Sequence, residues 1–112
     1  MTIEERRAGD VTILVLAGKL TIGGGHELLK ERIADVIRQG NDKLLLNLTE
    51  VPYVDSAGLG ELVRTYTAVN RKGGQLKLLG LAKRIRDQLR LTKLLTVFDI
   101  VETEQAALDS FS

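Results

Sequence analysis

The sequence predicts an α/β domain with a largely parallel sheet, and two observations carry this prediction. Short apolar runs rich in β-branched residues alternate along the chain with segments whose apolar residues recur at helical spacing. The helical segments are also long enough to serve as crossovers, because parallel neighbours need a connection of a dozen or more residues. No internal repeat is found, so we expect one such unit.

The length and composition are those of a single globular domain. A chain of 112 residues buries roughly two-thirds of its unfolded surface, enough for one core. Apolar residues make up 44% and charged residues 28%, which is typical of a folded chain. We therefore expect one domain over residues 1–112. The absence of cysteine excludes a disulfide scaffold and thiolate chemistry.

Nothing in the sequence favours a membrane or nucleic acid as partner. The apolar runs are too short to span a bilayer and the first ten residues lack the apolar core of a signal peptide, so we expect a cytoplasmic protein. The formal net charge is only +1. Residues 83–93 are basic and the C-terminal segment is acidic, which leaves two interpretations, solvated helix faces or a docking surface for an acidic partner. The basic segment lacks the interleaved aromatics of nucleic acid binding.

The first half of the chain predicts two strands in a hairpin, a helix and a third strand. An edge strand over 3–7, the turn Gly9-Asp10 and a buried strand over 11–17 form the hairpin. A helix follows the glycines at 23–25 and ends at Gly40. Its apolar stripe comprises Leu28, Leu29, Ile33, Val36 and Ile37. The next strand covers 43–48.

The second half continues the alternation. A helix that carries Leu59, Leu62, Val63, Tyr66 and Val69 on one stripe ends at Gly73-Gly74. The segment QLKLLGL, 75–81, is the third core strand. A short helix through Ile85 and Leu89, a strand around 96–101 and a helix around 106–111 complete the chain.

Ser56 lies between a buried strand and a helix, in the stretch VPYVDSAGLGELV, residues 51–63. As an N-cap it would accept hydrogen bonds from the first N–H groups of the helix. A cap does not require Gly58 and Gly60, each of which costs up to about 1 kcal/mol inside a helix. We interpret these glycines as clearing the surface around the hydroxyl. A phosphate there would be held by the helix N-terminus and would add about −1.5 to −2 charges beside Asp55.

Catalysis is a competing use of the same serine. The G-x-S-x-G elbow requires a glycine two residues before the serine, and Val54 stands there. The single histidine, His26, is expected to be solvated or to cap its helix, and without a second histidine a metal site is not expected. The glycines at 23–25 lack a nucleotide-binding signature, so we interpret them as a flexible turn. We expect no enzyme activity, no metal and no cofactor.

The stretch LLLNLTEVPYVDSAGLGELV resembles the signature of the STAS domain, as found in small stand-alone bacterial anti-sigma factor antagonists. Upstream VTILVLAGKL and downstream GGQLKLLGL and LRLTKLLTVFDI extend the resemblance over about 11–101. It implies a mixed, mostly parallel sheet of four to five strands flanked by helices. The D-S-x-G-L-G core does not separate one branch of the family from another.

The resemblance also implies a phospho-switch. Unphosphorylated antagonists bind an anti-sigma factor that is itself a serine kinase and thereby free a sigma factor; phosphorylation ends the interaction and a phosphatase restores it. ATP belongs to the kinase. By motif position the phosphoacceptor is Ser56. The expected partner-binding residues are Asp55, Ser56, Ala57, Gly58, Leu59, Gly60 and Thr21.

One departure leaves an alternative open. Family members often carry an acidic residue after the G-x-L that ends the second strand, whereas Thr21 stands here, before the glycines. Thr21 could serve as a second phosphoacceptor. The other reading of the chain is a STAS interaction subunit of a transporter or a stress-signalling complex, in which Ser56 is a contact and is not modified.

Overall fold

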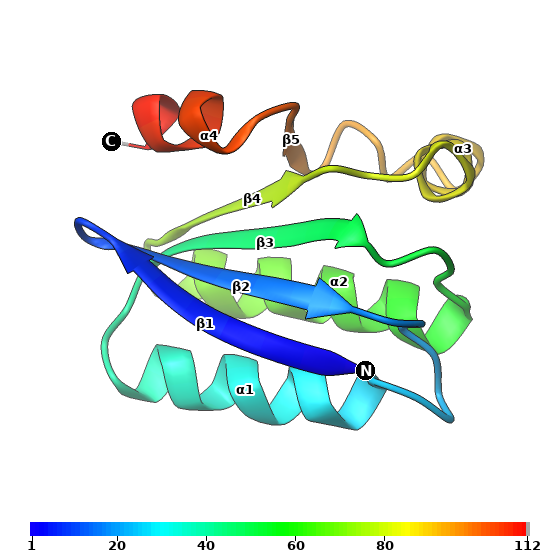
Figure 1. The fold of residues 1–112 in the computed structure, drawn as a ribbon, viewed down its shortest axis with the longest axis horizontal. Coiled ribbons are helices and arrows are strands. Elements are labelled where there is room, and N and C mark those ends of the chain that lie inside the picture. Colours follow the sequence, from blue (N-terminus) through cyan, green and yellow to red (C-terminus); the bar gives the residue numbers. More distant parts are fainter. Residues whose placement is uncertain (112) are drawn as a thin grey trace.

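The centre of the protein is a five-stranded sheet whose strands follow sequence order, β1-β2-β3-β4-β5 (Figure 1). The computed structural model describes residues 1–111. β1 pairs antiparallel with β2, and every later pairing is parallel. The sheet is therefore mixed and mostly parallel, which confirms the predicted fold class. The strands are β1 (Thr2–Ala8), β2 (Val11–Ala17), β3 (Lys43–Glu50), β4 (Gln75–Leu79) and β5 (Asp99–Val101).

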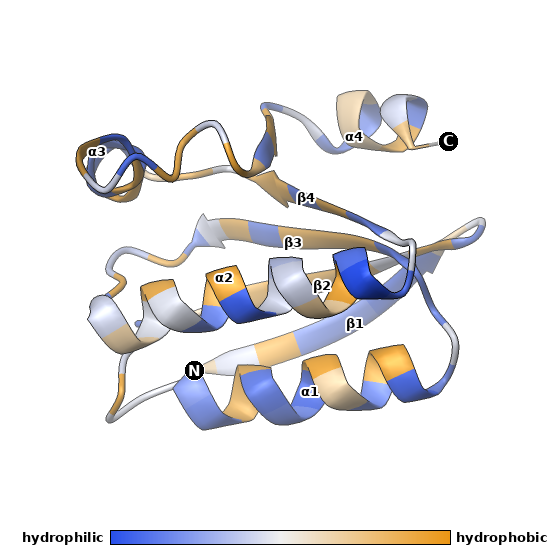
Figure 2. Ribbon diagram, turned by 180° about the vertical axis from the view of Figure 1, so that it is seen from behind, coloured by the Kyte–Doolittle hydropathy of each residue, from blue (hydrophilic) through white to orange (hydrophobic). Residues whose placement is uncertain are grey.

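In residues 1–111, four helices flank the sheet. Figure 2 shows α1 and α2 side by side across one face, and α3 contributes to the same core. The shorter α4 packs on the opposite face. Within residues 1–111, none of them combines the length and apolar character needed to cross a bilayer. The helices are α1 (His26–Arg38), α2 (Ser56–Arg71), α3 (Lys83–Leu91) and α4 (Glu104–Ser110).

The central strands are nearly continuous apolar runs because both faces of the sheet are covered. Leu14, Leu46 and Leu78 belong to the larger core, under α1, α2 and α3. Their neighbours in sequence, Ile13 and Leu45, lie in register with each other and face α4. Alternate residues of each strand thus supply two separate cores.

Some element boundaries differ from the prediction. β4 ends at Leu79 because Gly80 takes a φ of +76° and lies so close to Thr49 that a Cβ would be 2.2 Å from its Oγ1. β5 begins only at Asp99. α4 begins at Glu104, since the Thr103 hydroxyl accepts a hydrogen bond from the N–H of Ala106 at 3.0 Å.

The predicted apolar stripe of α1 is wrong at one position. Leu29, Ile33 and Val36 are buried and Ile37 packs against the core at its edge. Leu28, however, is 37% exposed. The buried stripe follows i, i+4, i+7 from Leu29, which turns Leu28 toward solvent.

Candidate functional site

The loops that follow β2 and β3 meet at the carboxyl edge of the sheet. Leu20, beyond the end of β2, forms an isolated parallel bridge with Val54. The Leu20 N–H donates to the carbonyl of Tyr53 at 3.0 Å, and the Leu20 carbonyl accepts from the N–H of Asp55 at 3.2 Å. Parallel strands direct their following loops to one edge, where sites in α/β folds are commonly built. This bridge places the loop 18–25 directly beside the start of α2.

Asp55, and not Ser56, is the N-cap of α2. Its Oδ1 accepts from the N–H of Gly58 at 2.8 Å, and its Oδ2 accepts from the N–H of Ile22 at 3.0 Å. The prediction of Ser56 as the cap is therefore wrong, and Ser56 is the first residue of the helix. A carboxylate has two acceptor oxygens, so it caps the helix and holds the loop after β2 at the same time, which a single hydroxyl at position 56 could not do.

These hydrogen bonds also hold Asp55 in its charged form. The N–H groups of Ile22 and Gly58, in that order of effect, lower the pKa of Asp55 below its usual range. Hydrogen bonds donated to a carboxylate favour its ionised form. A negative charge therefore lies immediately next to Ser56 at neutral pH.

The Ser56 side chain is exposed, and its hydroxyl has no hydrogen bond to any residue in 1–111. It lies in the first turn of α2, where backbone N–H groups lack intrahelical partners. Because Asp55 caps the helix, the hydroxyl of Ser56 has no structural hydrogen bond and is accessible to a reaction partner.

The two glycines of the motif have different roles. A Cβ on Gly58 would lie 2.1 Å from the carbonyl oxygen of Leu20, whereas a Cβ on Gly60 would meet nothing within 4 Å. Gly58 is buried and Gly60 is exposed. The interpretation that both glycines clear the surface around Ser56 is thus wrong for Gly58, whose missing side chain lets α2 pack directly against the loop after β2.

The remaining expected contact residues differ in accessibility. Ala57 and Leu59 are half-buried, and Leu59 packs against the larger core. The hydroxyl of Thr21 donates to the carbonyl of Gly24 at 3.2 Å, and the backbone N–H groups of both residues bond across the same turn. The glycine segment is thus a hydrogen-bonded turn, and the Thr21 hydroxyl is committed within it while that of Ser56 is not.

A buried carboxylate, Glu61, lies next to His26 and was not among the predicted site residues. Glu61, on α2, is 1% exposed, and its Oε1 lies 3.5 Å from Nε2 of His26 and has no hydrogen bond within residues 1–111. The expectation of a solvated or capping His26 is wrong: Gly25 is the N-cap of α1, and the imidazole is only 17% exposed. No hydrogen bond joins His26 to Ser56 in the described residues, so the pairing that a serine hydrolase needs is not formed.

A small and polar stripe on α2 is the signal that could have revealed Glu61. Gly58, Glu61 and Thr65 recur at i, i+3, i+7 beside the apolar stripe, and all three are buried. Such spacing marks one helix face. Glu61 can be predicted to be buried only when this face of α2 is known to pack against α1.

Burial raises the pKa of Glu61 above its usual range, and the charges of Arg64 and His26 offset this only in part. The pKa of Glu61 is higher in the folded than in the unfolded state, so the protonated carboxyl group makes the folded state more stable. This contribution is fully present below the unfolded-state pKa and is lost as the pH rises through the folded-state pKa. Glu61→Gln is therefore expected to match the wild type near pH 4 and to be more stable at pH 7, by up to about 1 kcal/mol.

Urea unfolding across this pH range measures the difference between the two proteins. Glu31→Gln is the matched control, because Glu31 is an exposed carboxylate on α1 that has no ion pair within residues 1–111 and is not among the groups that shift the pKa of Glu61. It should leave the pH dependence unchanged. A Glu61→Gln variant that is less stable than the wild type at pH 7 would show instead that the ionised carboxylate stabilises the fold through Arg64 and His26.

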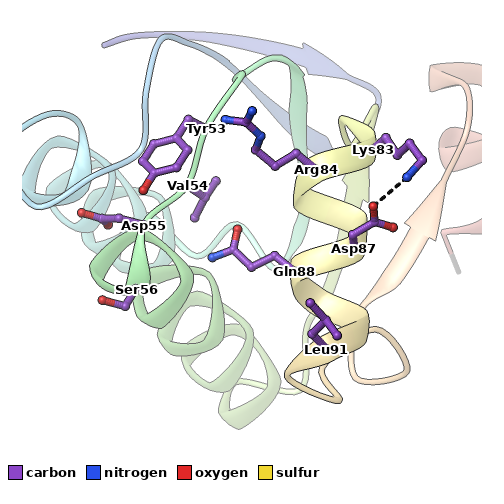
Figure 3. Close-up of a pocket in the computed structure, with 9 residues that line it drawn as sticks. All are labelled: Tyr53, Val54, Asp55, Ser56, Lys83, Arg84, Asp87, Gln88 and Leu91. Carbon is purple, nitrogen blue, oxygen red and sulfur yellow. Dashed lines mark hydrogen bonds and ion pairs between the residues drawn. The ribbon is translucent and has the colours of Figure 1, made fainter.

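A groove lies between the start of α2 and the side of α3. Its volume is about 760 Å³. In Figure 3, Ser56 stands on the α2 side, and the side chains of Arg84 and Gln88 extend from α3 into the space between the helices. The lining residues are Tyr53, Val54, Asp55, Ser56, Lys83, Arg84, Asp87, Gln88 and Leu91; we call this the α2–α3 groove.

Comparisons with known proteins agree with this architecture. The Bacillus subtilis anti-sigma-B factor antagonist is 35% identical over 85 residues, 76% of each chain. The crystal structure of a candidate anti-sigma factor antagonist from Thermotoga maritima has a TM-score of 0.91 at 26% identity, covering 97% of this chain and 93% of that one. The phosphorylated form of Bacillus SpoIIAA shares the fold, with a TM-score of 0.75 at 20% identity over 96% and 97% of the chains.

The family model described as the STAS domain matches residues 2–107. This range includes β1 and most of α4, and so extends beyond the 11–101 of the sequence resemblance. The match places the D-S-x-G-L-G stretch at the start of α2 within the family's domain. The chain therefore belongs to the STAS domain family.

Proposed function

We propose that this protein is an anti-sigma factor antagonist that is switched off by phosphorylation of Ser56. The observation that carries the proposal is the exposed, uncommitted hydroxyl of Ser56 in the first turn of α2, beside an ionised Asp55. Relatives named anti-sigma-B factor antagonists, which match 76% and 66% of this chain, support the antagonist function. The proposal places the protein in the cytoplasm.

The unphosphorylated surface binds an anti-sigma factor that is also a serine kinase, and the sigma factor is released. The kinase binds ATP and transfers the γ-phosphoryl group to Oγ of Ser56; the serine proton passes to a base of the kinase and ADP leaves. This chain needs no cofactor of its own. The surface is formed by Thr21, Asp55, Ser56, Ala57, Leu59 and Gly60.

The charge of the phosphate explains why phosphorylation would weaken binding of the partner. A phosphoserine carries about −1.5 to −2 charges at neutral pH, and here it would lie next to the carboxylate of Asp55. The pair concentrates negative charge where the unphosphorylated protein presents a neutral hydroxyl. A partner that accepts the neutral surface is repelled, and a phosphatase that removes the phosphate restores binding.

Intact-mass analysis after incubation with ATP and each ATP-binding anti-sigma factor kinase of the same genome tests the assignment. We expect a single phosphate adduct on the wild type and none on Ser56→Ala. Thr21→Val should keep the adduct, because the Thr21 hydroxyl is hydrogen-bonded within its own turn.

Two outcomes contradict the proposal. An adduct that survives Ser56→Ala would move the acceptor elsewhere, to Thr21 if Thr21→Val removes it. The absence of any adduct with every kinase would favour the other reading, a STAS interaction subunit that is not modified.

A further inference from the structure

A small cavity lies between α1 and α2, the two helices that Figure 2 shows side by side. Its volume is about 210 Å³. Its deepest walls are buried residues, and its opening is bordered by residues that are exposed or half-buried. We call this cavity the α1–α2 slot; its walls include Ile33, Ala34 and Ile37 of α1 and Glu61, Thr65 and Ala68 of α2.

Glu61 brings an unused hydrogen-bond acceptor to the wall of this slot. The residue is 1% exposed, and its Oε1 has no hydrogen bond within residues 1–111. Nε2 of His26 lies 3.5 Å from this oxygen and Nη1 of Arg64 lies 3.7 Å from it, and both distances are longer than those of ordinary N–H···O hydrogen bonds. Buried acceptors in folded proteins nearly always have a donor. The described chain leaves this one without a donor.

The slot is poorly suited to hold a water molecule as that donor. An ordered buried water needs two to four polar partners. The other buried polar residue of the slot is Thr65, whose hydroxyl already donates to the backbone carbonyl of Glu61 at 2.8 Å. The alanine and isoleucine side chains around them offer no polar atom. A donor that also has an apolar body suits these walls better than water does.

The size and the charges of the slot define this donor further. An apolar cavity of about 150 Å³ takes up benzene, so about 210 Å³ has room for a benzene ring with one substituent. Lys30 and Arg64 also line the slot, and both are exposed. Two cations at the opening disfavour an ammonium group, so the donor is expected to be neutral.

We propose that the α1–α2 slot is a binding site for a small neutral molecule with an apolar body and one hydroxyl group, such as a phenol or a short alcohol. The apolar body packs against Ile33, Ala34 and Ala68, and the hydroxyl donates to Oε1 of Glu61. This inference is independent of the proposed function, because it uses neither Ser56 nor a protein partner.

NMR titration of the ¹⁵N-labelled protein at pH 7 with phenol and, separately, with toluene tests the inference. The two probes have nearly the same shape, but only phenol has a donor. We expect both to shift the amide signals of residues 30–37 and 61–68, and phenol to bind about fivefold or more tightly than toluene. A slot that was merely apolar would favour toluene, which is the more hydrophobic of the two.

Three variants separate the acceptor from the cavity. Glu61→Met removes the acceptor and keeps an unbranched side chain of similar size, so toluene should now bind more tightly than phenol. Ala34→Leu fills the slot from an exposed position and should abolish the binding of both probes. Gln39→Leu is the matched control, because it adds the same side chain at an exposed position outside the slot, and it should bind both probes as the wild type does.

Three results would overturn the inference. They are wild-type binding of toluene that is as tight as that of phenol, no amide shift around the slot with either probe, and a preference for phenol that persists in Glu61→Met. Thermal melts show whether each variant is folded, and if Glu61→Met is not, the wild type and Ala34→Leu still decide. None of these results bears on the phosphorylation of Ser56, so the two proposals stand or fall separately.

Discussion

Gly58→Ala is expected to destabilise the protein by about 3 kcal/mol, the upper part of the usual range for overpacking. The added Cβ would lie 2.1 Å from the carbonyl oxygen of Leu20 and 2.9 Å from its carbonyl carbon. These are backbone atoms, and the same carbonyl accepts the hydrogen bond from Asp55. The clash can be relieved only by moving α2 away from the loop after β2, which breaks this contact.

Gly60→Ala is the matched control on the same helix. Nothing lies within 4 Å of a Cβ at this position, so alanine should stabilise the helix by up to about 1 kcal/mol. Urea unfolding of both variants measures the two effects, which are expected to have opposite signs. If both variants were stabilised, α2 would not be held against Leu20 as the structure describes.

Asp55→Ala is expected to lower the melting temperature by several degrees at neutral pH, because it removes the helix cap and the tie to Ile22 together. Asp55→Asn should fall between this variant and the wild type, since its single carbonyl oxygen can keep the cap but not both contacts. Asp35→Ala, which removes an exposed carboxylate paired with Arg38, should change little.

The loss of melting temperature in Asp55→Ala should decrease as the pH falls. The folded-state pKa of Asp55 is lowered, so the stabilisation is present above the unfolded value of 3.8 and is lost as pH falls through the folded pKa. The gap in melting temperature between the wild type and Asp55→Ala should therefore be full at pH 7 and shrink below pH 3.8. A gap that stays constant on acidification would show that the carboxylate charge plays no part.

Both predictions concern the frame around Ser56 and not the serine itself. Gly58 and Asp55 hold the first turn of α2 against the loop after β2. The hydroxyl of Ser56 is therefore not needed to hold this turn in place. A serine that caps its own helix would give up that hydrogen bond on phosphorylation. Under the proposed function, Ser56 would gain and lose a phosphate while Asp55 keeps the helix start in place.

The strands and helices were readable because their signals are local. The apolar run at 11–17 predicted β2 at its observed bounds. The stripe from Leu59 to Val69 predicted the side of α2 that packs on the larger core, although only Leu62 and Val69 of that stripe are fully buried. Each signal is contained within a few neighbouring residues whose side chains share a face. The errors lay at ends, as at β5, where the bounds depend on pairing with β4 and not on the segment itself.

Local patterns in the sequence were enough to predict the α/β class, the order of elements and the motif that places Ser56 at the start of a helix. The residue that caps this helix and the need for glycine at position 58 depend on contacts between segments that are distant in the sequence. Aspartate and serine are equally good caps by local preference, and the choice depends on Ile22, an N–H donor 33 residues away in sequence. Glycine is likewise needed at position 58 because the carbonyl of Leu20 lies against it, and Glu61 lies beside His26 of α1. The physical reason is common to all three: the bridge between Leu20 and Val54 brings distant segments into contact, and no pattern within either segment records what the other will present.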